Sequence, residues 1–154
     1  MNRPPLIAVD TMLFVYLFEQ SPEFGQAARR VFLAAEEGLC RLVASHLAPM
    51  EVLVKPKKVG ATELCRRYRH FFDGFPHLEL VPVDQGVAEI ASDLRASSRL
   101  RTPDAIHVAT AISAKADLFV TEDQRVKAPG DFRIGSTREA IALIESFDEA
   151  QPGR

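Results

Sequence analysis

The stretch LIAVDTMLFVYLF, residues 6–18, decides the fold class. Its first four residues are apolar, follow Pro4 and Pro5, and end at Asp10, which predicts a short strand buried on both faces. Residues 11–18 predict a helix that begins directly after this strand. A buried strand followed at once by a helix is typical of the α/β class, in which helices cover a parallel sheet.

The rest of the chain repeats this alternation. Strands are expected at 41–45, 78–83, 117–121 and near 132–134, and helices at 22–37, around 49–53 with an end at Pro56, and at 61–72, 87–97, 104–114 with Thr102 as its N-cap, and 137–147. The order predicts a three-layer α/β/α sandwich around a central parallel sheet of four to five strands. We expect one domain over residues 1–147, followed by a polar tail at 148–154, because no linker or repeat divides the chain.

Composition favours a globular chain of the soluble class. The 154 residues are 47% hydrophobic and 26% charged, which excludes a disordered chain, a collagen-like fibre and a disulfide scaffold. The two cysteines form no C-x-x-C pair and no uncharged stretch of 18 apolar residues occurs, so we expect a cytoplasmic protein without a membrane span. The net charge of −2 provides no overall basic field for nucleic acid but allows a local basic patch.

Four acidic residues are expected at one edge of this sheet, where parallel sheets bind their ligands. They are Asp10 and Asp123 after strands, Glu51 in the helix after the second strand, and Asp104 in the first turn of a helix. Taken singly, the last three are ordinary surface, turn or helix-terminal acids, whereas an acid in the apolar junction at position 10 is costly unless it is used.

A group of four carboxylates calls for a cation. Two carboxylates about 5 Å apart repel by roughly 3 kcal/mol at an effective dielectric constant of about 20. Oxygen ligands without His or Cys point to Mg²⁺ or Mn²⁺. Such an ion suits the attack of water on a phosphodiester, because it stabilises charge on the phosphate and lowers the pKa of the water.

The sequence resembles the PIN-domain family, and within it the VapC-type toxins, in four motifs. They are Val9-Asp10-Thr11, Ser45 through Glu51-Val52-Leu53, LRTPDAIHVATA at 100–111, and DLFVTED at 117–123, in the family's order over residues 6 to about 135. The resemblance implies a Mg²⁺- or Mn²⁺-dependent endoribonuclease in which Asp10, Glu51, Asp104 and Asp123 are the catalytic and metal-binding acids. It also implies the toxin of a type II toxin–antitoxin pair, with RNA as substrate, an antitoxin as partner, and a homodimer.

Two positions depart from the family pattern. Met12 stands where a small polar residue is common, and Glu122 stands where Asn is common in the T-x-D motif. Met12 removes a hydrogen bond near the acids, while Glu122 either adds a fifth acid near the metal or points to solvent. Neither change removes a matched acid, so both bear on metal affinity and rate more than on the class of reaction.

Hydroxyl and imidazole side chains near the acids are candidates for supporting roles. His107 lies three residues after Asp104 on the same helix face, where it either donates to a carboxylate or a phosphate, or is a partly buried structural histidine. Thr121 either orients a carboxylate or a metal-bound water, or is plain strand structure. Thr11 is a further candidate of this kind.

Basic residues gather in two places that are candidates for RNA binding. The first group is Lys55, Lys57, Lys58, Arg66, Arg67 and Arg69, and the second is Arg95, Arg99 and Arg101 just before Asp104. Such groups can follow an RNA backbone, and the first group can equally be a solvated helix face or an antitoxin contact. The alternative function is therefore a non-catalytic PIN-fold module that binds RNA or a partner protein.

Overall fold

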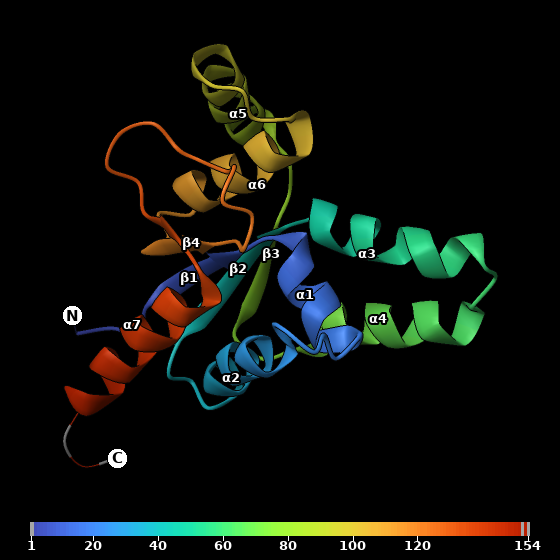
Figure 1. Cartoon of the computed structure of the whole chain (residues 1–154), viewed down its shortest axis with the longest axis horizontal. Coiled ribbons are helices and arrows are strands. Elements are labelled where there is room, and N and C mark those ends of the chain that lie inside the picture. The colour runs from blue at the N-terminus through green and yellow to red at the C-terminus, as the bar shows by residue number, and fades with distance from the viewer. Residues whose placement is uncertain (1, 152, 154) are drawn as a thin grey trace.

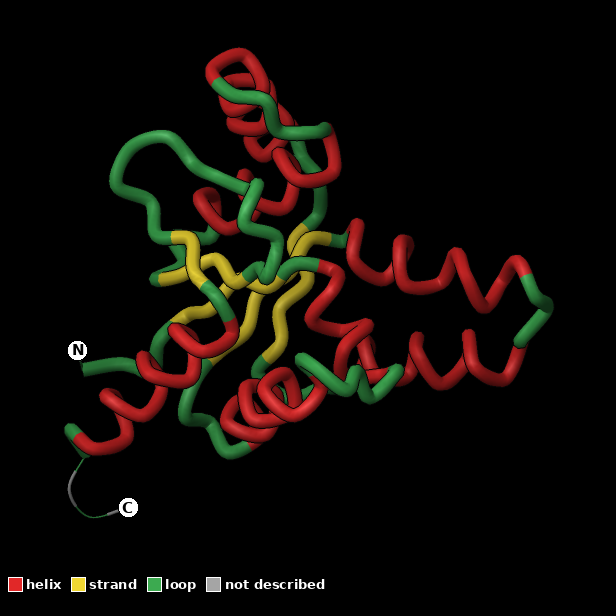
Figure 2. Tube along the Cα trace, viewed as in Figure 1, coloured by secondary structure: helices red, strands yellow, loops and turns green. Residues whose placement is uncertain are grey.

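The computed structural model describes residues 2–151 and 153, and it contains the predicted three-layer sandwich. Its strands are β1 (Leu6–Val9), β2 (Arg41–Ser45), β3 (Leu78–Val81), β4 (Leu118–Val120) and β5 (Ile134–Gly135). All four strand pairs are parallel, in the order β3-β2-β1-β4-β5. The central parallel sheet expected from the sequence is confirmed, and Figure 2 shows it between layers of helices.

Seven helices in the described residues cover the sheet. They are α1 (Thr11–Phe18), α2 (Gly25–Glu36), α3 (Leu47–Lys58), α4 (Thr62–Gly74), α5 (Gln85–Ser97), α6 (Thr102–Ser113) and α7 (Thr137–Glu149). The two faces of the sheet have separate cores, one with α1, α2 and α7, the other with α5 and α6. In Figure 1, α3 and α4 extend side by side away from the sheet as a hairpin.

The central strand β1 supplies both cores because successive side chains of a strand point to opposite faces. Ile7 and Val9 belong to the core under α1, α2 and α7, and Leu6 and Ala8 belong to the core under α5 and α6. All four residues are buried. The strand therefore carries its last residue, and the acid that follows, to the middle of the sheet's carboxyl edge.

Aromatic side chains anchor the base of the α3–α4 hairpin. The ring of Phe14 in α1 lies 4.8 Å, centroid to centroid, from that of Phe72 in α4, and Phe18 stacks on Tyr68 at 4.4 Å. Pairs at such separations stabilise beyond the area they bury. The aromatic residues of α4 thus pack against the core, which fixes the direction in which the hairpin leaves the body.

Several predicted boundaries were wrong. Helix α3 runs through Pro56 to Lys58 and gives way to Gly60, whose φ of +68° is the left-handed conformation that glycine adopts without strain. Helix α2 begins at Gly25 rather than residue 22. Helix α6 has Arg101 rather than Thr102 as its N-cap residue. Pro56 cannot donate a backbone hydrogen bond to the carbonyl four residues before it, yet α3 continues for two more residues, so the proline does not by itself end the helix.

The last helix, predicted to end at residue 147, continues as α7 through Glu149. The polar tail therefore begins later than residue 148. Residues 152 and 154 of that tail lie outside the described part of the chain. Among residues 2–151 and 153, no helix is long and apolar enough to cross a membrane.

Candidate active site

Asp10 lies at the carboxyl end of β1 and caps the N-terminus of α1. Its Oδ1 accepts a hydrogen bond from the backbone N–H of Leu13 at 3.2 Å, and its Oδ2 accepts one from the hydroxyl of Thr121 at 2.7 Å. Burial raises the pKa of this carboxyl above its ordinary value, and the hydrogen bond from Thr121 offsets part of that rise. Ionisation of Asp10 therefore costs free energy, because burial removes water from its carboxylate.

The hydroxyl of Thr121 joins two of the acidic segments. It donates to Asp10 and accepts a hydrogen bond from the backbone N–H of Asp123 at 3.1 Å. Thr121 is buried and directly follows β4, which pairs with β1. The spacing of the T-x-D motif thus has a local reason, since the hydroxyl two residues before Asp123 sets the path of the loop beside Asp10.

Glu51, on α3, is held by Thr11 and His107. The hydroxyl of Thr11 donates to Glu51 Oε1 at 2.8 Å, and His107 Nε2 lies 2.7 Å from the same oxygen and 3.1 Å from Thr11 Oγ1. The Thr11 hydroxyl donates its own proton to Glu51, so Thr11 Oγ1 acts as an acceptor toward His107. The Nε2–H of His107 therefore donates both to Glu51 Oε1 and to Thr11 Oγ1. Burial opposes ionisation of Glu51, but these hydrogen bonds and the charges of His107 and Arg101 hold its pKa below the ordinary value.

His107 is buried, and its Nε2 donates a hydrogen bond to the carboxylate of Glu51. The two readings considered for it, a buried histidine and a donor to a carboxylate, therefore occur together. Its Nδ1 is buried without a hydrogen-bond partner in the described residues. The histidine therefore orients Glu51 from inside the protein and does not face the surface.

Asp104 and Asp123 are paired with arginines. Arg101 Nε lies 3.2 Å from Asp104 Oδ2. The Arg125 side chain forms a two-point contact with Asp123, with Nε on Oδ1 and Nη2 on Oδ2, both at 2.9 Å. The hydrogen bonds from Arg125 lower the pKa of Asp123 to about 2. These side chains, with Arg99, line a pocket of about 120 Å³.

Arg125 is a residue that the sequence analysis missed. The available signal was its position two residues after Asp123, a spacing at which an arginine can reach back to the carboxylate across a turn. Arg125 therefore joins Arg99 and Arg101 beside Asp104, and it comes from another segment of the chain.

Glu122 takes neither of the positions considered for it. Its Oε1 accepts a hydrogen bond from the backbone N–H of Thr137 at 2.8 Å and another from the Thr137 hydroxyl. Thr137 is the first residue of α7 and is buried. A carboxylate is favoured there because the N-terminus of a helix carries partial positive charge. Glu122 thus ties the loop that carries Asp123 to α7.

The basic residues of α3 and α4 are all exposed, as is Met12. Lys55 pairs with Glu19 at 2.9 Å and Arg66 pairs with Glu63 at 2.6 Å. The lysines of the group lie near the distal end of α3, and the arginines lie on α4 along the same hairpin (Figure 1). The hairpin therefore presents positive charge, part of which is already paired within the chain.

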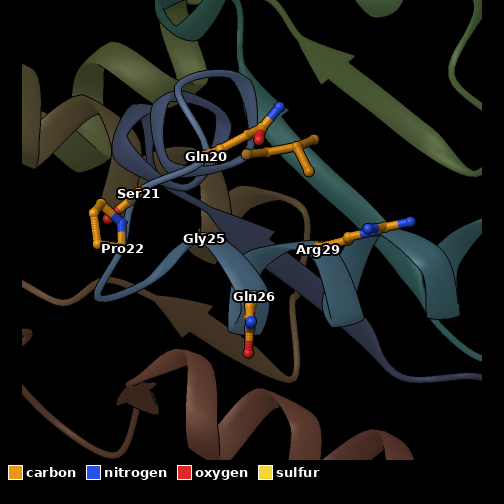
Figure 3. A pocket seen from close by; sticks show the side chains of 7 residues that line it. Gln20, Ser21, Pro22, Gly25, Gln26 and Arg29 are labelled. Carbon is orange, nitrogen blue, oxygen red and sulfur yellow. The ribbon is translucent and has the colours of Figure 1, made fainter.

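A larger hollow of about 500 Å³ lies between the end of α1 and the start of α2 (Figure 3). Its lining includes Gln20, Ser21 and Arg29 but none of the four acids. At its edge, a Cβ on Gly25 would lie 3.0 Å from the backbone carbon of Gln20, so the close approach of the two helices needs glycine. This hollow has no side chains that would carry hydrolytic chemistry.

The four acids suit a divalent cation in their chemistry, because each offers carboxylate oxygens and the nearby threonines orient them. As the side chains lie, no three His, Cys, Asp or Glu side chains of residues 2–151 and 153 are arranged to hold an ion. Arg101 and Arg125 occupy two of the four carboxylates. Binding an ion with all four acids therefore requires these arginines to release them.

Comparison with known proteins identifies the motifs and the fold. A family model described as PIN domain matches residues 7–131. No curated protein matches the chain. Among solved structures, a toxin–antitoxin complex from Klebsiella pneumoniae is similar, with a TM-score of 0.65 and 22% identity over 85% of this chain and 97% of that one.

Two further solved structures share the fold. VapBC2 from Rickettsia felis, bound to a DNA fragment from their promoter, has a TM-score of 0.65 and 16% identity over 85% of this chain and 98% of that one. DNA-bound VapBC from Salmonella typhimurium has a TM-score of 0.64 and 22% identity over 86% and 98%.

Replacing Asp10 by Asn is expected to raise the melting temperature of the metal-free protein by a few degrees at about pH 7.5. The pKa of Asp10 is raised by folding, so the folded state binds its proton more tightly and ionisation opposes folding above that pKa. The gain should shrink as the pH falls through the raised pKa of Asp10, where the wild-type carboxyl takes up a proton. Thermal melts in EDTA measure it, and a gain that does not change with pH would contradict the assignment.

Replacing Glu122 by Ala is expected to lower the free energy of unfolding by about 1–2 kcal/mol, because the first N–H of α7 and the Thr137 hydroxyl lose their acceptor. Glu122→Gln is the matched control, since its amide oxygen can still accept both bonds. Urea unfolding of both variants measures the difference. An Ala variant as stable as the wild type, or a Gln variant that loses as much stability as Ala, would contradict the role given to the two hydrogen bonds.

Proposed function

The chain belongs to the PIN domain family, and from that premise we propose that it is a Mg²⁺- or Mn²⁺-dependent endoribonuclease, the VapC-type toxin of a type II toxin–antitoxin pair. The observation that carries the proposal is the hydroxyl of Thr121, which joins Asp10 to the segment of Asp123. A second set of hydrogen bonds orients Glu51 through Thr11 and His107. Side chains from four separate motifs are thereby directed to the carboxyl edge of one sheet.

Asp10, Glu51, Asp104 and Asp123 would hold the ion. When bound, the ion stabilises charge on the phosphate and lowers the pKa of an attacking water. Asp10 gains most from a cation, because its carboxylate is the one that burial disfavours in the charged form. Thr11 and Thr121 keep the oxygens of Glu51 and Asp10 in fixed directions, and His107 does the same for Glu51.

The RNA backbone is assigned to the two basic groups. Arg99 and Arg101 border the pocket that contains Asp104 and Asp123. Lys57, Lys58, Arg67 and Arg69 extend the positive charge along the α3–α4 hairpin. Contacts of this kind follow phosphates without reading bases, so affinity for RNA should fall steeply as salt rises.

Two observations support a protein partner: the fold shared with a toxin–antitoxin complex, and the exposed surface of the α3–α4 hairpin. The Klebsiella pneumoniae structure is a toxin–antitoxin complex, and we propose an antitoxin for this chain also. Exposed apolar side chains on α3, Met50 and Val54, together with Val59 directly after it, offer a surface for the antitoxin or for a second copy in a homodimer. Both cysteines are free and buried, which suits a reducing cytoplasm.

A second candidate function is a non-catalytic module that binds RNA or a partner protein. The observation that favours it is the pairing of two acids with Arg101 and Arg125, which already balances their charge without an ion. On this alternative the basic groups bind a partner and the acids serve the structure. Cleavage of RNA separates the two candidates.

Incubation of the purified protein with a mixed cellular RNA pool is expected to produce discrete cuts in Mn²⁺ or Mg²⁺ and none in EDTA. Asp10→Asn, purified identically, should lose at least about 100-fold in rate, since loss of a residue that merely supports a metal ligand already costs roughly 10–100-fold. Mapping the cut ends then identifies the substrate. Absence of cuts from folded protein shown by mass spectrometry to be free of an antitoxin would favour the binding module.

A further inference from the structure

The fork of Arg125 occupies both oxygens of Asp123. Nε contacts Oδ1 and Nη2 contacts Oδ2, both at 2.9 Å, and the Arg125 backbone N–H also donates to Oδ1 at 3.0 Å. A carboxylate held at both oxygens by a guanidinium has little room for a divalent ion. The two cations also repel, so an ion and Arg125 compete for Asp123.

The competing arginine is able to leave without breaking the fold. The side chain of Arg125 is 82% exposed, and within residues 2–151 and 153 it forms hydrogen bonds and an ion pair with Asp123 alone. Ion pairs between exposed side chains contribute little to stability. Arg125 therefore has freedom to change partner when an ion takes the carboxylate.

The place to which Arg125 would turn is also defined. It lines one pocket with Asp104, Asp123 and the predicted RNA-binding residues Arg99 and Arg101. Its charge acts on Asp104 as well as on Asp123. The planar guanidinium is suited to two-point contact with a phosphate as it is with a carboxylate. A released Arg125 would thus remain beside Asp104 and Asp123, where the proposed nuclease would bind the scissile phosphate.

We propose that Arg125 exchanges partners during binding: it holds Asp123 in the metal-free protein, yields Asp123 to the divalent ion, and then contacts a phosphate of the RNA. The proposal rests on the proposed nuclease function, because it takes Asp123 as a metal ligand. Arg125 acts as a binding residue, and it forms no covalent bond at any stage. If Arg125 exchanges partners in this way, replacing its side chain should raise the affinity for metal and lower the affinity for RNA.

Calorimetric titration with Mn²⁺ and binding of a short single-stranded RNA in Ca²⁺ test both halves. Arg125→Gln is expected to bind Mn²⁺ about fivefold more tightly than wild type, and RNA about fivefold more weakly. The slope of log affinity for RNA against log salt should fall by about 1. Arg30→Gln is the matched control, because Arg30 also pairs with one exposed acid, Glu145, but lies outside the acidic site.

The outcomes separate this proposal from the function on which it rests. If wild type binds Mn²⁺ and Arg125→Gln binds it no more tightly, the exchange is wrong while the metal site stands. If Mn²⁺ binding tightens and RNA binding does not change, Arg125 only competes with the ion, and the exchange is again wrong. If wild type binds no Mn²⁺ at all, the proposed function and the exchange both fail. Arg125→Lys, which keeps the charge but loses the fork, should recover less than half of the RNA affinity.

Discussion

A carboxylate at the partly buried end of the central strand is the constraint on which the rest of the site depends. Asp10 follows a strand buried on both faces, and burial raises its pKa. A charge in such a place is tolerated only with hydrogen-bond donors aimed at it. The protein supplies them from the N-terminus of α1 and from Thr121 at the end of β4. The neighbouring strand and the following helix are therefore positioned by the same group that the proposed chemistry needs.

The acids fall into two groups that differ in how they are held. Asp10 and Glu51 are fixed by uncharged or buried donors, which are Thr121, Thr11 and His107, and these contacts can persist when a cation arrives. Asp104 and Asp123 are held by exposed arginines, which compete with a cation. One half of the site is thus preorganised and the other half is exchangeable. In the proposed nuclease, the exchangeable half would be the one that responds to metal and to RNA.

Hydrophobic patterning predicted the class of fold well. The run at 6–9 and its closing Asp10 predicted the central strand, and the alternation along the chain predicted the parallel sheet, because buried parallel strands read as continuous apolar runs. Helix ends were predicted less well. Pro56 lies within α3, where the helix continues to a glycine in the left-handed conformation. The partner of Glu122 was not predictable, because it lies in α7, fifteen residues along the chain. For Arg125 the sequence offered only its spacing of two residues from Asp123, because the contact depends on the turn taken after β4.

In the proposed nuclease, the carboxyl edge of this sheet binds a divalent ion among the four acids. Anomalous diffraction from a crystal of the protein grown in Mn²⁺ tests it most directly. We expect an anomalous peak for Mn²⁺ beyond the carboxyl ends of β1 and β4. Oxygens of Asp10 and Asp123 should lie within coordination distance of the ion, and the guanidinium of Arg125 should no longer contact Asp123. A structure in which Mn²⁺ is absent from this edge, with Arg101 and Arg125 still on Asp104 and Asp123, would contradict it.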